Sequence, residues 1–240
     1  MPPSLSEKVI RTMLLENFKK SFDTGKVFRL LGAKEGRRIS PSSMRRVDMM
    51  AEDVEGMLKP QLSYRILKLI SAERGSIRLA DGTRFKSPKI SKTLANSDSV
   101  CCFLATVGPL VDMEIDHLMK QRRYADAYVL DALGSMSAEN VVEQFYQRMS
   151  KRQADKQGGV TLRFSPGYCD WPIQQQHELF ALFENSNTPE IDLSDSCLMS
   201  PRKSVSGLFG LLPPGVPSHS HPVNPCNSCT KRDCIARRSN

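Results

Sequence analysis

The sequence contains few aromatic residues and no long apolar run. Aromatic side chains make up 7% of its 240 residues, and tryptophan occurs once. The longest apolar stretch, residues 100–111, is too short to cross a bilayer and is interrupted by Thr106, Gly108 and Pro109. Residues 1–22 carry charged side chains throughout, so they lack the uninterrupted apolar core of a secretion signal. These absences predict a protein without a membrane span, located in the cytoplasm.

Cysteine is too sparse for a fold that disulfides hold together. The chain has seven cysteines, an odd number at low density, and it is long enough to bury a hydrophobic core without cross-links. Three of them, Cys226, Cys229 and Cys234, nevertheless lie close together in an otherwise polar segment. In a reducing compartment, clustered thiols more often bind metal or act in redox chemistry than form disulfides. The cluster therefore predicts a metal centre, with a redox thiol pair as the alternative.

The spacing of the three cysteines does not determine the fourth ligand of such a centre. Zinc takes four tetrahedral ligands, and His219 or His221 would complete a set of three cysteines and one histidine. A [4Fe–4S] cluster usually takes a fourth cysteine, which Cys169 or Cys197 would supply. Zinc and an iron–sulfur cluster therefore both stay open.

The positive charge is concentrated at the two ends of the chain. The formal net charge is +8, from 34 basic and 26 acidic side chains. Residues 1–50 hold 11 basic and 5 acidic side chains, and residues 226–240 hold four and one, whereas residues 51–225 hold 19 and 20. No helix-turn-helix, zinc-finger or aromatic-rich RNA-binding pattern accompanies the charge. We expect solvated basic ends or docking onto an acidic partner protein, and no nucleic-acid partner.

The order of the predicted elements indicates an α+β fold. Spacing of apolar residues predicts an amphipathic helix from Val9 to Phe22, ending at Gly25. Ser40 followed by Pro41 is typical of a helix start, and Pro60 ends that second helix. Further helices are predicted at 110–122, 124–151 and 174–183, a hairpin at 76–87, strands at 99–107, 160–164, 197–199 and 205–212, and a strand or helix at 62–70. We expect one domain with a mostly antiparallel sheet packed by long helices, followed by an irregular Cys-rich tail.

A turn near the middle of the chain has the residue types of a ligand site. Arg163 begins the segment RFSPGYCDWP, and a guanidinium can hold a carboxylate through two parallel hydrogen bonds. Gly167 lets the backbone approach a ligand closely, while Tyr168 and Trp171 offer flat apolar faces. The alternative is a turn packed on the core, with Arg163 at the surface.

Two further segments are candidates for the same site. Small residues flank Val205 in the segment Ser204–Gly207, which predicts a close strand-to-strand contact or a backbone surface against a flat ligand. Glu143 lies on the predicted long helix, where a solvated surface role is the alternative.

Four segments in order resemble the activation domain of cobalamin-dependent methionine synthase and its free-standing relatives. They are LATVGPLVD (104–112), AENVVEQF (138–145), RFSPGYCDWP (163–172) and SVSG (204–207). The resemblance covers roughly residues 95–212. It divides the chain into an N-terminal part of the same domain (1–94), an activation-domain-like core (95–212) and a Cys-rich tail (213–240).

The resemblance implies S-adenosylmethionine binding. By analogy with the family, Arg163 holds the ligand carboxylate, the backbone near Gly167 and Tyr168 contacts the adenine, and Glu143 lies near the amino group and sulfonium. The full set of ligand-contacting residues that it implies is Glu143, Arg163, Pro166, Gly167, Tyr168, Ser204, Val205, Ser206 and Gly207.

The resemblance also implies an accessory role rather than a complete enzyme. The family's domain presents the methyl donor to cob(II)alamin held by a partner, so that one-electron reduction is trapped by methylation. The partner implied is a corrinoid-binding protein or a corrinoid-dependent methyltransferase, and cobalamin enters through it. The Cys-rich tail resembles the tails of free-standing relatives. By this resemblance, Cys226, Cys229 and Cys234, with Cys169, would hold a cluster that supplies the electron for the reduction.

The sequence departs from the family at two places. A family carboxylate six residues before the arginine is Gln157 here, and Leu208-Phe209 replaces an aromatic pair. These departures keep a second function open, namely an iron–sulfur electron-transfer or scaffold protein without S-adenosylmethionine binding.

Overall fold

The computed structural model describes residues 11–14, 24–33, 39–184 and 190–216. Its helices are α1 (Thr24–Leu30), α2 (Pro41–Met57), α3 (Pro88–Leu94), α4 (Leu110–Lys120), α5 (Tyr124–Ala154) and α6 (Gln176–Ala181), the last preceded by a 3-10 turn at Ile173–Gln175. Its strands are β1 (Arg11–Leu14), β2 (Gln61–Glu73), β3 (Ser76–Leu79), β4 (Arg84–Lys86), β5 (Ser99–Thr106), β6 (Gly159–Val160), β7 (Asp192–Leu193), β8 (Met199–Ser200) and β9 (Ser204–Leu212). Within these ranges, no helix combines the length and the apolar character needed to cross a membrane.

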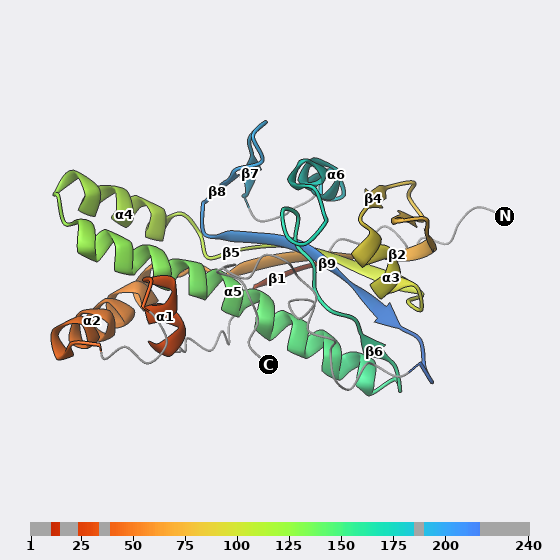
Figure 1. The fold of residues 1–240 in the computed structure, drawn as a ribbon, viewed down its shortest axis with the longest axis horizontal. Coiled ribbons are helices and arrows are strands. Elements are labelled where there is room, and N and C mark those ends of the chain that lie inside the picture. Colours follow the sequence, from red (N-terminus) through yellow and green to blue (C-terminus); the bar gives the residue numbers. More distant parts are fainter. Residues whose placement is uncertain (1–10, 15–23, 34–38, 185–189, 217–240) are drawn as a thin grey trace.

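One antiparallel sheet organises the chain. Its strand order is β4-β3-β2-β5-β9-β6, and β1 pairs with the first residues of β2. The short hairpin of β7 and β8 forms a second, separate sheet. The long helix α5 runs along β9 on one side, while α6 lies on the other (Figure 1). The predicted α+β fold with a mostly antiparallel sheet and long helices is therefore confirmed.

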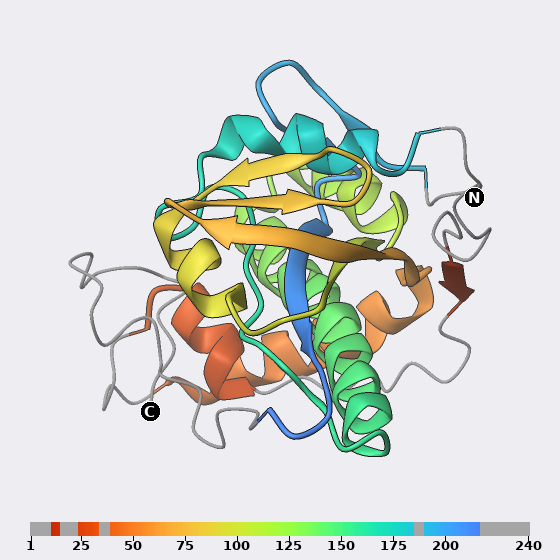
Figure 2. The same ribbon diagram turned by 90° about the vertical axis from the view of Figure 1, so that its right-hand side faces the viewer.

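The sheet is buried on both faces, because helices cover each of them (Figure 2). Alternate residues of β5 show this directly. Phe103 and its same-face neighbours join the core beneath α1, α2, α4 and α5, whereas Leu104 belongs to the core beneath α3 and α6. Phe103, Phe145 of α5 and Phe209 of β9 have ring centroids 6.0–6.2 Å apart. The sheet therefore separates two apolar cores, and each face carries its own set of surface elements.

Two helices begin with the same local signal. The hydroxyl of Ser40 accepts a hydrogen bond from the backbone N–H of Ser43 at 3.1 Å, and Pro41 occupies the first turn of α2. The hydroxyl of Ser87 accepts in the same way from Ile90 N–H at 3.1 Å, and Pro88 begins α3. The start of α2 was predicted from this signal, whereas α3 was not predicted.

The predicted N-terminal helix is wrong at residues 11–14, which form β1. Arg11 pairs with Tyr64 and Leu14 with Gln61, at the start of β2. The hairpin partner β3 pairs with β2 only from Leu69 onward, so the first part of this strand offers unpaired backbone groups to another segment. Gly25 also does not end a helix, since it lies in the first turn of α1. Residues 15–23 lie outside the described residues.

Burial divides the cysteines into reactive and protected thiols, and this generates a test. Burial raises the pKa of the Cys101 and Cys102 thiols, whereas Cys169 is exposed. We expect iodoacetamide at pH 8 to modify Cys169 in the native protein after any bound metal has been removed with a chelator, and to modify Cys101 and Cys102 only after unfolding. Peptide mapping by mass spectrometry measures this residue by residue.

The same burial determines the sign of a pH effect. Folding keeps the protons on Cys101 and Cys102, whereas the unfolded chain releases them near the ordinary thiol pKa of about 8.5. The free energy of unfolding should therefore fall as the pH rises above that value. In the alkylation experiment above, equal rates of iodoacetamide labelling for Cys102 and Cys169 in the native protein would contradict the burial of Cys102.

Candidate functional site

The edge of the sheet next to β9 carries the first predicted site residue. The chain continues from β6 alongside β9: Thr161 N–H donates to Gly210 O at 2.9 Å, and Phe164 and Leu208 exchange two backbone hydrogen bonds of 2.9 Å. Phe164 packs into the core beneath α6. Arg163 precedes it, and its side chain pairs with α5 on the opposite side of the sheet. The extended backbone therefore places the arginine between the edge strand and the long helix.

Arg163 forms an ion pair with a carboxylate of α5. Its Nη2 lies 3.0 Å from Oε2 of Glu139. The arginine side chain is 15% exposed and the glutamate side chain 59% exposed. The other terminal nitrogen, Nη1, is buried and has no hydrogen-bond partner among the described residues. The guanidinium thus keeps an unused donor, and a second anionic group such as a carboxylate would reach it only if the atoms that cover Nη1 moved aside.

Glu139, which was not among the predicted site residues, is the carboxylate paired with Arg163. Glu143 is exposed and accepts a hydrogen bond from Gln147 Nε2 at 3.1 Å. The two glutamates are four residues apart and therefore share one face of the helix. Helical spacing places both acids toward the edge strand, but it cannot determine which of them is level with Arg163.

A tight turn holds the predicted loop after Arg163. Gly167 has φ +86° and donates its N–H to Trp171 O at 2.9 Å, and Tyr168 N–H donates to Ser165 O at 3.2 Å. The positive φ explains the glycine at this position. Trp171 is 2% exposed and Tyr168 53% exposed. The tryptophan therefore anchors the loop to the core and leaves the tyrosine ring facing outward.

Further contacts attach this loop to α3. The Asp170 carboxylate accepts hydrogen bonds from Ser87 Oγ and, at 2.9 Å, from Lys89 N–H. The Trp171 ring meets Phe85 of β4 edge-on, with ring centroids 5.2 Å apart. Two neighbouring elements thus fix the loop that follows the arginine.

The segment Ser204–Gly207 is the first half of β9 and lies beside this loop. A Cβ atom added at Gly207 would come within 2.4 Å of Phe164 O and 3.1 Å of Ser165 Oγ. Ser206 is buried, and its hydroxyl accepts from Gln176 Nε2 at 3.2 Å. Of the two interpretations of this segment, the close strand-to-strand contact is the one that the structure contains.

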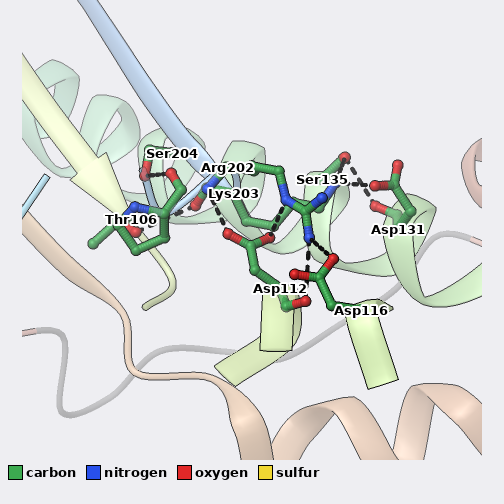
Figure 3. Close-up of polar contacts among 9 residues, drawn as sticks. Thr106, Asp112, Asp116, Asp131, Ser135, Arg202, Lys203 and Ser204 are labelled. Carbon is green, nitrogen blue, oxygen red and sulfur yellow. Dashed lines mark hydrogen bonds and ion pairs between the residues drawn. The ribbon is translucent and has the colours of Figure 1, made fainter. Parts of the chain in front are cut away.

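Two charged residues fix the start of β9, a feature that the sequence did not reveal (Figure 3). Lys203 is 7% exposed, and its Nζ lies 2.6 Å from Asp131 Oδ1 and 3.0 Å from Ser135 Oγ on α5. Arg202 Nη2 lies 2.7 Å from Asp116 Oδ1 on α4, and this hydrogen bond raises the pKa of the guanidinium. The strand therefore enters the sheet in a fixed position relative to both helices.

Of the two sequence departures, Leu208-Phe209 lies beside the segment that carries Arg163, and Gln157 lies six residues before the arginine. Leu208 and Phe209 are fully buried, on opposite faces of β9. Gln157 follows the end of α5 with φ +61°, and its carbonyl accepts from Gly215 N–H at 3.2 Å. Because Phe164 pairs with Leu208, Phe209 lies across the strand pair from Arg163 and on the same side of the sheet as α5. The Leu208-Phe209 departure therefore belongs to the surroundings of the arginine, whereas Gln157 lies at the end of α5.

The predicted metal ligands lie mostly beyond the described chain. Cys226, Cys229 and Cys234 are outside the described residues. Cys169 is exposed with φ +57°, and Cys197 is buried. In the part that the structure describes, no group of three or more His, Cys, Asp or Glu side chains could hold a metal ion. A metal centre would therefore depend on the tail cysteines.

Comparison with known proteins identifies related sequences and folds. The family model described as "Vitamin B12 dependent methionine synthase, activation domain" matches residues 88–214, slightly more than half of the chain. A crystal structure of the MetH reactivation domain bound to AdoHcy is similar, with a TM-score of 0.64 and 17% sequence identity over 87% of this chain and 80% of that one. No curated protein matches the sequence.

The contact at Gly207 generates a stability test. We expect Gly207→Ala to cost roughly 1–3 kcal/mol of the free energy of unfolding, because the new methyl group overlaps a backbone carbonyl. Urea unfolding measures this, and hydrogen exchange at Phe164 and Leu208 should become faster. The matched control is Gly56→Ala in α2, where nothing lies within 4 Å and up to about 1 kcal/mol is gained. Wild-type stability of Gly207→Ala would refute the close contact.

Proposed function

The chain belongs to the family of vitamin B12-dependent methionine synthase activation domains, and from this premise we propose that it binds S-adenosylmethionine to reactivate a corrinoid protein. The observation that carries the proposal is Arg163, which is paired on one side with Glu139 and keeps a buried, unpartnered Nη1 on the other. The similar structure of the MetH reactivation domain contains AdoHcy, the demethylated form of the same ligand.

The charges around Arg163 fit the amino-acid end of this ligand. S-adenosylmethionine has one carboxylate, one ammonium and one sulfonium, and so carries one net positive charge. Arg163 would bind the carboxylate through Nη1, and Glu139 and Glu143 would face the two cations. These three side chains together carry one net negative charge, which complements the ligand.

The loop and β9 would hold the rest of the ligand. Tyr168 exposes its ring and Gly167 its backbone, so the adenine would lie against these two residues. We also assign Pro166, Ser204, Val205 and Ser206 to the ligand site, where they would shape the backbone that the ligand meets. The bound ligand supplies a methyl group, while the protein's part is to bind and orient it.

The openness of this site supports an accessory role. Glu139 and Tyr168 are both more than half exposed, so a ligand held between them would remain accessible to a second protein. The family name connects the domain to a cobalamin enzyme. We therefore assign the partner as a corrinoid-binding protein or a corrinoid-dependent methyltransferase, which brings the cobalamin.

The tail cysteines would add a metal centre to this function. Cys226, Cys229 and Cys234, with Cys169 as fourth ligand, suit a [4Fe–4S] cluster or zinc. The exposed thiol of Cys169 lies one residue after Tyr168, so a cluster bound there would lie close to the proposed adenine site. An iron–sulfur cluster at that position would provide an electron for the partner's corrinoid.

Titration with S-adenosylmethionine tests the ligand site. We expect Arg163→Ala to weaken binding at least about tenfold in isothermal calorimetry, because charge-assisted hydrogen bonds contribute about 1.5–3 kcal/mol. Arg163→Lys keeps the charge but loses the planar guanidinium whose two terminal nitrogens would serve Glu139 and the ligand at once, so it should fall between wild type and alanine. Arg78→Ala, exposed on β3, is the matched control and should bind as wild type does.

The same titration separates the two carboxylates. Glu139→Gln should weaken binding more than Glu143→Gln, because only Glu139 contacts Arg163. Equal affinity of wild type and Arg163→Ala would refute the site. No binding by the wild-type protein would instead favour the electron-transfer or scaffold function.

Anaerobic purification tests the tail. We expect iron and sulfide in about four-to-four ratio with a broad absorption near 400 nm for an iron–sulfur cluster, or stoichiometric zinc without colour. Cys226→Ser should lose the metal, and Cys169→Ser should lose it only if Cys169 is the fourth ligand. Cys101→Ala, buried in the sheet, is the matched control. Absence of metal from the wild-type protein would rule the centre out.

A further inference from the structure

One long stretch of this positively charged chain contains no lysine or arginine. Residues 164–201 include six aspartates and glutamates but no lysine or arginine, although the whole chain carries a net charge of +8. This is the longest interval between two basic residues in the sequence. The negative charge is therefore concentrated in the segment that forms the loop after Arg163, α6 and the β7–β8 hairpin.

Two described parts of this acidic segment, residues 177–184 and 191–193, line a hollow on the sheet face opposite α5. The hollow has a volume of about 670 Å³ and lies between α6 and the residues around β7. Leu104 of β5 and Phe183 are buried residues of its lining, and Ile191 and Leu193 add further apolar surface. Glu178, Glu184 and His177 are the charged or titratable residues of the lining, which includes no lysine or arginine. The hollow thus combines an apolar floor with an acidic rim.

Among the residues that the structure describes, an exposed apolar side chain and a buried acceptor without a donor lie near the hollow. Leu198, in the hairpin that contributes Leu193, is 70% exposed. Gln176, next to His177, is 2% exposed, and its Oε1 is buried without a donor among the described residues. Its Nε2 donates to Ser206, which faces Leu104 across the β5–β9 register. Apolar surface and a buried acceptor therefore occur together beside an acidic rim.

The hollow lies apart from the charged residues of the proposed ligand site, although Ser206 of that site bonds to Gln176 beside it. Neither Arg163 nor Glu139 lines it. Arg163 pairs with α5, whereas Leu104 and the residues of α6 belong to the core on the other face of the sheet. An occupant of the hollow would therefore leave the Arg163 side open.

We propose that this acidic hollow, defined by Leu104, His177, Glu178, Phe180, Glu184 and Leu193, is a docking site for a cationic segment of a partner protein. The segment inserts apolar side chains over Leu104 and places lysine or arginine against Glu178 and Glu184. Charge complementarity identifies this occupant, since the negative rim repels nucleic acid and acidic proteins. A basic tail without apolar side chains would bind less tightly, because it would leave the apolar floor of the hollow uncovered. Such a contact is steered by charge and weakens with salt.

A labelled peptide tests the docking site on the full-length protein. The probe is a 12-residue peptide of lysine and leucine in helical spacing, followed by fluorescence anisotropy at low and physiological salt. The triple variant Glu178→Gln, Glu184→Gln, Asp192→Asn should bind it at least tenfold more weakly. The matched control removes the same charge from α2, with Asp48→Asn, Glu52→Gln and Asp53→Asn, and should change affinity less than twofold. Circular dichroism verifies that both variants fold.

Three outcomes would overturn the proposal. The first is an equal loss of peptide affinity in the two triple variants, and the second is equally tight binding of a control peptide of lysine and serine. The third is self-association of the wild-type protein in sedimentation that is lost in the triple variant with Glu178→Gln, because a second copy would then be the occupant. Affinity for S-adenosylmethionine should be unchanged in both variants. Failure of the docking site and failure of the proposed ligand site are therefore distinguishable.

Discussion

The close backbone contact between the edge segment and β9 is the constraint on which the candidate site depends. Phe164 and Leu208 exchange hydrogen bonds, and Gly207 leaves no room for a side chain against the Phe164 carbonyl. This contact determines the position of Arg163, because the arginine precedes Phe164 on an extended backbone. The long helix then supplies Glu139 at the matching level. Lys203 acts at the other end of the same strand, where it fixes the start of β9 to α5. The site is thus held by backbone geometry, and its exposed ion pair adds about 1 kcal/mol at most.

Burial of the sheet on both faces separates the functions of its two sides. Phe103 and Leu104 are neighbours in β5, yet they belong to different apolar cores. One face presents α5 with the carboxylates beside Arg163, and the other presents α6 with the acidic hollow. A ligand on the first side and a partner on the second would therefore not compete for space. The loop after Arg163 connects the two sides of the sheet, because its Trp171 is anchored in the core beneath α6.

Local signals predicted most of the elements but not their mutual positions. Ser40-Pro41 identified the start of α2, and the alternating hairpin and the apolar β5 were both predicted. Ser87-Pro88 carries the equivalent signal for the start of α3, which was not predicted. Strand β1 could not be predicted, because its partner is a free stretch of β2 nearly fifty residues away. The pairing of Arg163 with Glu139 could not be predicted for the same reason: spacing assigns a helix face, whereas the register between α5 and the edge strand is a tertiary property.

Average charge concealed the feature that distinguishes the two faces. Residues 51–225 are nearly neutral overall, with 19 basic and 20 acidic side chains, yet residues 164–201 contain six of those acids and no base. The proposed ligand and the proposed partner segment are both cationic, so they would repel one another if they shared one surface. Helix layers on either side of a sheet lie about 20 Å apart, roughly twice the Debye length at physiological salt. Screening over that distance leaves little repulsion between two cations. The sheet therefore permits two negative sites in a basic protein without making occupation of one oppose the other.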